Sequence, residues 1–172
     1  MMIKVLLIAT TLFSLTFSSL TIAAPADDEH YTLYLTRHAE KQSDAKDPDL
    51  TSCGRLRAFH LATTLKEAGL ERIYSTSYTR TLNTASPTAN QLKLPVKQYS
   101  PRGLGQLARE LLSNKQNALI VGHSNTTPAL LSEITGQKFD KIDESEFQML
   151  FQVHIIGDKK VVTILRQPLT CR

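Results

Sequence analysis

Hydrophobic residues recur along the chain in two alternating patterns. Short runs rich in apolar, β-branched and aromatic residues predict strands at 31–38, 72–76, 95–99 and 117–121. Between and after them, apolar positions at helical spacing predict helices at 52–69, 79–92, 104–114 and 127–135. This alternation of strand and helix predicts an α/β fold, a three-layer sandwich with a mostly parallel central sheet covered on both faces.

The first predicted helix has recognisable ends. Thr51 or Ser52 can cap its amino end, and Gly69 ends it. The apolar side chains expected to face the core are those at helical spacing, Leu56, Phe59, Leu61, Ala62 and Leu65. In the second helix, Pro87 predicts a kink or a break. The last two segments, 147–156 and 159–166, flank Gly157 and predict a β-hairpin.

The first 26 residues differ from the rest. Lys4 precedes an apolar stretch over 5–22, and small residues follow at 23, 24 and 26, which is the layout of a secretory signal peptide. The alternative is an uncleaved membrane anchor, but several Ser and Thr residues dilute the hydrophobicity of the stretch. We therefore predict a signal peptide over 1–26, a single domain over 27–172 and export to the periplasm, with membrane contact only through the leader if it stays uncleaved.

Charge and cysteine content narrow the class of partner. The formal net charge of +4 at pH 7 comes without a clustered basic stripe, which argues against nucleic acid and is compatible with a small anionic ligand. No Asp or Glu occurs from Arg72 to Arg109. In an exported protein Cys53 and Cys171 can pair, although two unpaired thiols remain the alternative. No metal-ligand spacing occurs, so neither a metal nor another cofactor is predicted, and the sequence does not indicate an oligomeric state.

Candidate chemistry lies where strands lead into helices. Ligands of parallel sheets bind at the carboxyl ends of the strands, and three such loops carry Arg37 with His38, Arg80, and His123. Two arginines and two histidines in one pocket suit phosphoryl transfer. A neutral imidazole can attack phosphorus to give a phosphohistidine, which water then hydrolyses. Arginine forks match phosphate oxygens in pairs and stabilise their charge.

The turn at 122–124 admits a second interpretation. Ser124 would be the nucleophile of a strand-to-helix elbow, followed in the chain order of α/β-hydrolases by Asp140 or Asp143 and by His154. However, Thr126 stands where that elbow needs a glycine, and His154 lies within an alternating strand pattern. We therefore favour His123 as the working residue of this turn.

Four segments in order, LTRHAEK, LTSCG, IYSTSYTRTLNTA and IVGHSNT, together resemble the histidine phosphatase superfamily, also called the phosphoglycerate mutase-like family. The resemblance spans residues 31–135 and implies the phosphoglycerate mutase-like fold. It implies that His38 is the nucleophile, that Arg37 and Arg80 hold the phosphoryl group, and that His123 completes the pocket. The backbone amide of Ser124 would add a further phosphate contact.

The chain departs from the family pattern in its general acid. Members usually carry a carboxylic acid between the Arg-Thr segment and the late Gly-His, and here that interval is free of acids up to Arg109, while Glu110 is expected on a solvated helix face. Glu40 is the leading candidate, ahead of Asp44, Asp47 and Asp49, and its alternative role is to pair with Arg37 or Lys41, or to orient a loop. Without such an acid, alkoxide leaving groups depart more slowly by about 10²–10⁴, whereas acyl phosphates, phosphohistidine and pyrophosphates suffer least.

The sequence thus predicts an exported, metal-independent phosphatase that hydrolyses a small phosphorylated substrate through a phosphohistidine on His38. The competing class is a non-catalytic anion-binding protein on the same fold. A serine hydrolase that uses Ser124 is the least favoured alternative.

Overall fold

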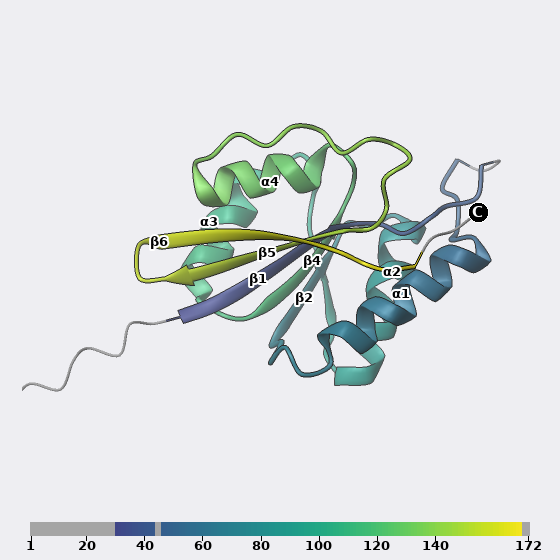
Figure 1. The fold of residues 1–172 in the computed structure, drawn as a ribbon, viewed down its shortest axis with the longest axis horizontal. Coiled ribbons are helices and arrows are strands. Elements are labelled where there is room, and N and C mark those ends of the chain that lie inside the picture. Colours follow the sequence, from purple (N-terminus) through teal and green to yellow (C-terminus); the bar gives the residue numbers. More distant parts are fainter. Residues whose placement is uncertain (1–29, 44–45, 170–172) are drawn as a thin grey trace, which may run out of the picture.

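The computed structural model describes residues 30–43 and 46–169. The predicted signal peptide over 1–26 and the candidate acid Asp44 lie outside the described residues. Four helices and one six-stranded sheet follow one another along the described chain (Figure 1), in the order β1 (His30–Arg37), α1 (Ser52–Leu65), β2 (Arg72–Ser75), α2 (Thr79–Leu92), β3 (Val96–Gln98), α3 (Leu104–Asn114), β4 (Ala118–Gly122), α4 (Thr126–Thr135), β5 (Met149–Ile156) and β6 (Lys159–Arg166).

The strands are arranged in the order β3-β2-β4-β1-β5-β6. The four strands from β3 to β1 are parallel, and β5 and β6 add an antiparallel hairpin beside β1. Because β1, β2 and β4 are parallel neighbours, their carboxyl ends meet at one edge of the sheet. The predicted α/β sandwich is confirmed.

Two hydrophobic clusters on opposite faces of the sheet make the three layers. In β4, Leu119 and Val121 point to the cluster that contains α1 and α2, whereas Ala118 and Ile120 point to the cluster that contains α3 and α4. Figure 1 shows α1 and α2 on one side of the molecule and α3 and α4 on the other. Such burial on both faces explains why β4 is apolar at every position.

The buried face of α1 agrees with the prediction in part: Leu61, Ala62 and Leu65 are buried as predicted. Leu56 and Phe59 are 46% and 61% exposed, and the helix instead buries a charged residue, Arg57, together with Gly54 and Ala58. Helical spacing alone did not separate the two faces because alanine and glycine also line the contact with the rest of the chain. The predicted start is confirmed, since the Thr51 side chain accepts a hydrogen bond from the Gly54 amide.

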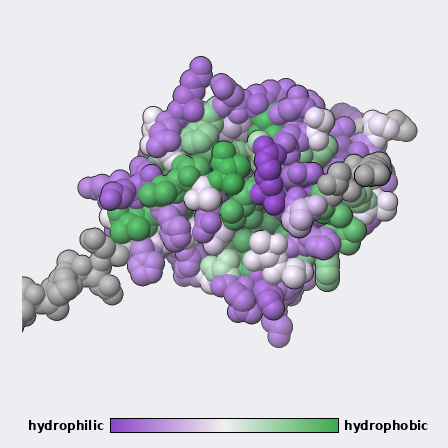
Figure 2. Space-filling model, in the orientation of Figure 1, coloured by the Kyte–Doolittle hydropathy of each residue, from purple (hydrophilic) through white to green (hydrophobic). Residues whose placement is uncertain are grey.

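Two further expectations concern the later elements. Helix α2 runs without a break through Pro87. The predicted hairpin is present as β5 and β6, and its exposed apolar side chains include Ile156, Val161 and Ile164. In Figure 2 apolar residues gather along the line that β5 and β6 follow in Figure 1. Within the described chain, no helix is both long and apolar enough to cross a membrane.

Of the two cysteines, only Cys53 lies within the described residues. Cys53, at the start of α1, is disulfide-bonded. Cys171 is the sequence's one other cysteine and lies outside the described residues.

Candidate active site

The carboxyl ends of β1 and β4 form the floor of the site. The two strands stay paired to their last residues, and the amide of His38 donates to the carbonyl of Gly122 at 3.0 Å. Helix α2 braces the turn after β1 from the other side, because the amide of Ala39 donates to Thr84 Oγ1 at 3.0 Å. His38 is therefore buried, and its position is set by backbone hydrogen bonds on both sides.

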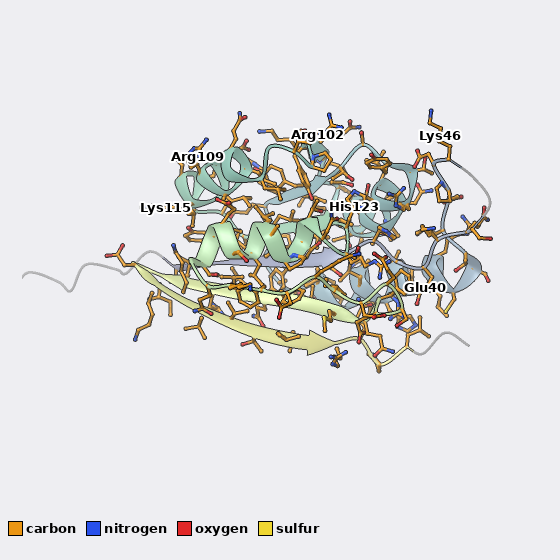
Figure 3. All side chains as sticks on the ribbon, turned by 90° about the horizontal axis from the view of Figure 1, so that it is seen from above. Glu40, Lys46, Arg102, Arg109, Lys115 and His123 are labelled. Atoms are coloured by element: carbon orange, nitrogen blue, oxygen red, sulfur yellow. The ribbon has the colours of Figure 1, made fainter. Side chains whose placement is uncertain are left out.

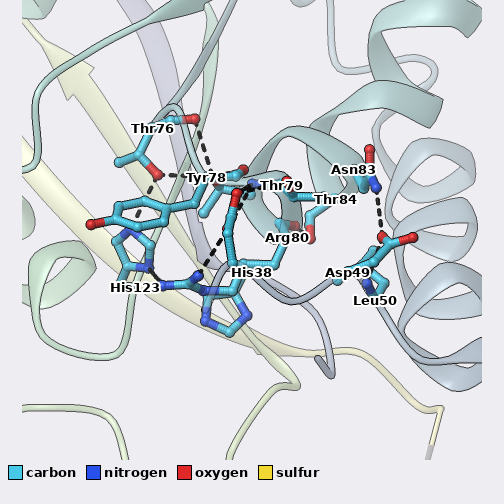
Figure 4. A network of polar contacts seen from close by, with 12 residues as sticks. His38, Asp49, Leu50, Thr76, Tyr78, Thr79, Arg80, Asn83, Thr84 and His123 are labelled. Atoms are coloured by element: carbon cyan, nitrogen blue, oxygen red, sulfur yellow. Dashed lines mark hydrogen bonds and ion pairs between the residues drawn. The ribbon is translucent and has the colours of Figure 1, made fainter. Parts of the chain in front are cut away.

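The predicted residues converge on one open cavity of about 420 Å³. Arg37, His38, Arg80, His123 and Ser124 all line it. The ring centroids of His38 and His123 are 5.6 Å apart. Figure 4 shows both histidines beside the Arg80 side chain.

One ring nitrogen of His38 is unprotonated and can act as a nucleophile. Its Nδ1 lies 2.8 Å from the carbonyl oxygen of Ala39, which can only accept, so Nδ1 holds the proton. Burial, followed by the nearby arginines and His123, lowers the pKa of His38 to about 3, although the bond to Ala39 works in the other direction. The imidazole is consequently neutral at pH 7, with an unprotonated Nε2.

His123 is neutral as well. Burial and the charges of Arg80 and Arg37 lower the pKa of His123 to about 4. Its Nδ1 lies 3.5 Å from Nη2 of Arg80, which only donates, so the proton is on Nε2, which donates to Thr76 Oγ1 at 3.0 Å (Figure 4). His123 thus presents a hydrogen-bond acceptor toward Arg80.

The two site arginines each keep an unused donor. Nε of Arg37 and Nε of Arg80 are buried and have no hydrogen-bond partner in the described part of the chain. A buried donor without an acceptor is costly, so the pattern is typical of a site that a ligand completes. An oxyanion is the ligand that suits guanidinium donors beside neutral imidazoles.

The segment that follows α4 wraps the Arg37 guanidinium. Nη1 of Arg37 donates to the carbonyl oxygens of Asp143 and Glu144 at 2.9 Å and of Glu146 at 3.2 Å. Nη2 contacts the Glu144 carboxylate at 2.7 Å, and the ring of Phe147 lies 4.0 Å from the guanidinium carbon. Arg37 is therefore fixed by a segment in which the sequence offered no motif.

Glu144 is a pocket residue that the sequence analysis missed. Its carboxylate lines the cavity and accepts from Ser124 Oγ at 2.8 Å, and it pairs with Lys141 at 2.9 Å. Hydrogen bonds from Lys141 and Ser124, together with the Arg37 charge, lower the pKa of Glu144 to about 2. The Glu144 carboxylate is therefore ionised at neutral pH.

Glu40 is not brought to the cavity. Its carboxylate pairs with buried Arg57, at 2.9 and 3.0 Å from Nε and 2.6 Å from Nη2, instead of with the predicted partners Arg37 or Lys41. Figure 3 shows Glu40 well away from His123, beside the helices. These contacts indicate a structural role for Glu40, as the ion-pair partner of Arg57. Its position does not favour the predicted role of proton donor.

The other predicted acids have structural partners too. Asp47 accepts from the backbone amide and hydroxyl of Thr79 at the start of α2 and lies 3.5 Å from Nη1 of Arg80. Asp49 accepts from Asn83 at 2.6 Å and from Arg55 at 2.7 Å. Asp47 thus also helps to orient Arg80.

The serine alternative lacks its base. Ser124 Oγ donates to Glu144, and His154 lies in β5, where its Nδ1 is 3.2 Å from Thr32 Oγ1 near the opposite end of β1. Among the described residues, no group of three or more His, Cys, Asp or Glu side chains could hold a metal ion.

The fold defines the class: a phosphoglycerate mutase-like α/β sandwich, here with a cavity lined by arginines and histidines at the strand ends. Residues 33–100 match the model of the histidine phosphatase superfamily (branch 1). The resemblance that the motifs predicted is therefore confirmed for the segment that holds Arg37, His38 and Arg80, while His123 and Ser124 lie beyond it.

Solved structures share this fold at low sequence identity. The protein histidine phosphatase SixA, complexed with tungstate, has a TM-score of 0.65 at 19% identity, covering 77% of this chain and 94% of its own. A mycobacterial glucosyl-3-phosphoglycerate phosphatase has a TM-score of 0.62 at 12% identity, and the match covers 82% of this chain and 100% of the phosphatase. YhfR of Bacillus stearothermophilus has a TM-score of 0.59 at 19% identity, and the match covers 78% of this chain and 96% of YhfR. No curated protein sequence matches the chain. The family match and the fold together support a phosphatase.

Proposed function

We propose that this chain is a metal-independent phosphatase that works through a phosphohistidine on His38. The observation that carries the proposal is the pairing of a neutral, buried His38 with two arginines whose Nε donors are unused. Neutral imidazole is the nucleophilic form, and the unused donors would meet the oxygens of a phosphoryl group. The family match supports the same chemistry.

The first step transfers the phosphoryl group to the protein. Nε2 of His38 attacks phosphorus while the bond from phosphorus to the ester oxygen breaks, and the leaving group departs with the electron pair. The Nδ1–H bond to Ala39 keeps the ring oriented and compensates the positive charge that develops on it. Arg37 and Arg80 stabilise the charge on the equatorial oxygens.

The second step frees the site. Water attacks phosphorus, the bond from phosphorus to Nε2 breaks, and inorganic phosphate leaves. Glu144 lies beside the reacting group and is ionised, so it serves to orient Arg37 and Ser124 and is not the proton donor. Substrates whose leaving groups depart as stable anions are therefore the best substrates.

The localisation follows from the leader. The signal peptide over 1–26 and the single domain over 27–172 remain predictions, and with them export to the periplasm. A disulfide at Cys53 is compatible with an oxidising compartment. The natural substrate is a small phosphorylated molecule.

Hydrolysis of p-nitrophenyl phosphate from about pH 4 to about pH 8, with EDTA present, tests the proposal. We expect turnover in the mature protein and in Ser124→Ala, and none in His38→Ala. His60→Ala is the matched control, since His60 lies on the exposed face of α1. A folded wild-type protein without turnover would favour the anion-binding alternative, and loss only in Ser124→Ala would favour the serine hydrolase.

A further inference from the structure

Two cations at the mouth of the cavity have no role in the chemistry described above. Lys41 follows β1 and Arg102 precedes α3, and both are exposed side chains that line the same cavity as His38. Neither forms an ion pair with any residue that the structure describes. The inner arginines differ from them, because Arg37 contacts Glu144 and Arg80 contacts Asp47.

The backbone that carries Arg102 is fixed. A tight turn is closed by the Gly103 amide, which donates to the carbonyl of Ser100 at 3.0 Å, and the Arg102 amide donates to Ser100 Oγ at 3.3 Å. Pro101 occupies the turn position that its fixed φ suits. The turn therefore presents Arg102 at a set place on the cavity wall.

Tyr99 ties this turn to the sheet. Its amide donates to the Ser75 carbonyl at 2.9 Å, and its hydroxyl donates to the Val121 carbonyl at 3.1 Å. Both acceptors lie in the strands that lead to the site, β2 and β4. The turn that carries Arg102 thus keeps its position relative to His123, one residue beyond the end of β4.

A phosphoryl group bound at His38 occupies the inner part of the cavity, so the rest of the substrate extends past these outer side chains. A neutral remainder would leave two cations without a counter-charge beside it, whereas an anionic remainder would pair with them. We propose that the substrate carries a second anionic group, such as a further phosphate or a carboxylate, which binds Arg102 together with Lys41. This inference rests on the proposed function for the position of the first phosphoryl group.

Non-hydrolysable phosphonates test the proposal without requiring turnover. Calorimetry would compare alkane bisphosphonates of increasing chain length with the matched alkyl monophosphonates, on the mature wild-type protein and on Arg102→Gln, Lys41→Gln and the double variant. We expect at least one bisphosphonate to bind about tenfold more tightly than its monophosphonate, the effect of one charge-assisted contact. In the double variant the bisphosphonate should keep only a statistical advantage, because either of its two identical ends can bind the inner site.

Arg109→Gln is the control for loss of one positive charge. Arg109 is exposed on α3, is labelled apart from Arg102 in Figure 3, and does not line the cavity. Its variant should keep the full bisphosphonate advantage. The proposal is overturned if no chain length gives an advantage in the wild type, or if the double variant retains it. A protein that binds the bisphosphonate with this preference but never hydrolyses p-nitrophenyl phosphate would refute the proposed function and leave the second anion site standing.

Discussion

Arg37 and Arg57 are both buried arginines, with side chains 4% and 3% exposed, and their surroundings assign them different roles. Arg57 is held by the Glu40 carboxylate on two of its nitrogens and by the Leu169 carbonyl. Arg37 is held by carbonyls and Glu144 on its outer nitrogens and lines the cavity beside His38, which Arg57 does not. The contrast separates a structural ion pair from a binding group, although both residues are arginines near the same loop.

Glu40→Gln tests this assignment. Removal of the carboxylate charge breaks the buried ion pair of Glu40 with Arg57, so we expect the free energy of unfolding to fall by about 3–5 kcal/mol. Urea denaturation measures the fall, and turnover of p-nitrophenyl phosphate by the folded fraction should remain near wild type. An unchanged stability together with a loss of about 10²–10⁴ in turnover of an alkyl phosphate would instead restore Glu40 as the general acid.

The ionisation of His38 is a second prediction at this scale. With a pKa lowered to about 3, the folded protein keeps His38 neutral at pH 5, where free imidazole is mostly protonated. The unfolded chain binds the proton first, so the stability due to this group is complete above about pH 6.5 and is lost as the pH falls toward about 3. Heteronuclear NMR of the ring nitrogens should show an Nδ1-protonated tautomer at pH 5, and titration near pH 6.5 would contradict the account.

At the scale of elements, the packing of α1 explains why the LTSCG segment has a glycine at position 54. A Cβ at this position would collide with the backbone carbonyl of Glu40, since α1 packs directly on the loop after β1. The same loop is tied to the helix start, because the Thr51 amide donates to the Glu40 carbonyl at 2.9 Å. The helix thus holds the loop that extends from His38.

Gly54→Ala should therefore lower the free energy of unfolding by about 1–3 kcal/mol, the usual cost of overpacking, and shift the loop beside His38. Gly103→Ala is the matched control, since its Cβ would lie 3.6 Å from the nearest atom, and its effect should stay within about 0.5 kcal/mol. Thermal unfolding of the two variants measures the difference, and equal effects would show that the packing of α1 on this loop is not tight.

Elements were predicted well where one pattern ran over many residues, as in β4, α3 and the β5–β6 hairpin. For α1 the predicted core positions Leu61, Ala62 and Leu65 are buried, but the prediction missed the burial of Arg57, which depends on Glu40, a partner from another part of the fold. A hydrophobic pattern cannot report such a partner. Leu56 and Phe59 were assigned to the core for the same reason.

For the whole molecule, the convergence of Arg37, His38, Arg80 and His123 could be predicted because parallel strands bring their carboxyl ends to one edge. The role of the segment after α4 could not. Glu144 binds Arg37 from more than a hundred positions further along the chain, and its loop has neither a motif nor a periodic pattern. Contacts made through backbone carbonyls cannot be predicted from the residue type, because every residue has such a carbonyl.

The central claim is the covalent intermediate on His38. We would mix the mature wild-type protein with p-nitrophenyl phosphate, quench in alkali, which preserves phosphohistidine, and locate the phosphate by mass spectrometry, with His60→Ala and His38→Ala in parallel. The account predicts phosphate on His38 in the wild type and in His60→Ala, and none in His38→Ala. Turnover in the wild type with phosphate on Ser124, or with none on the protein at any quench time, would contradict it.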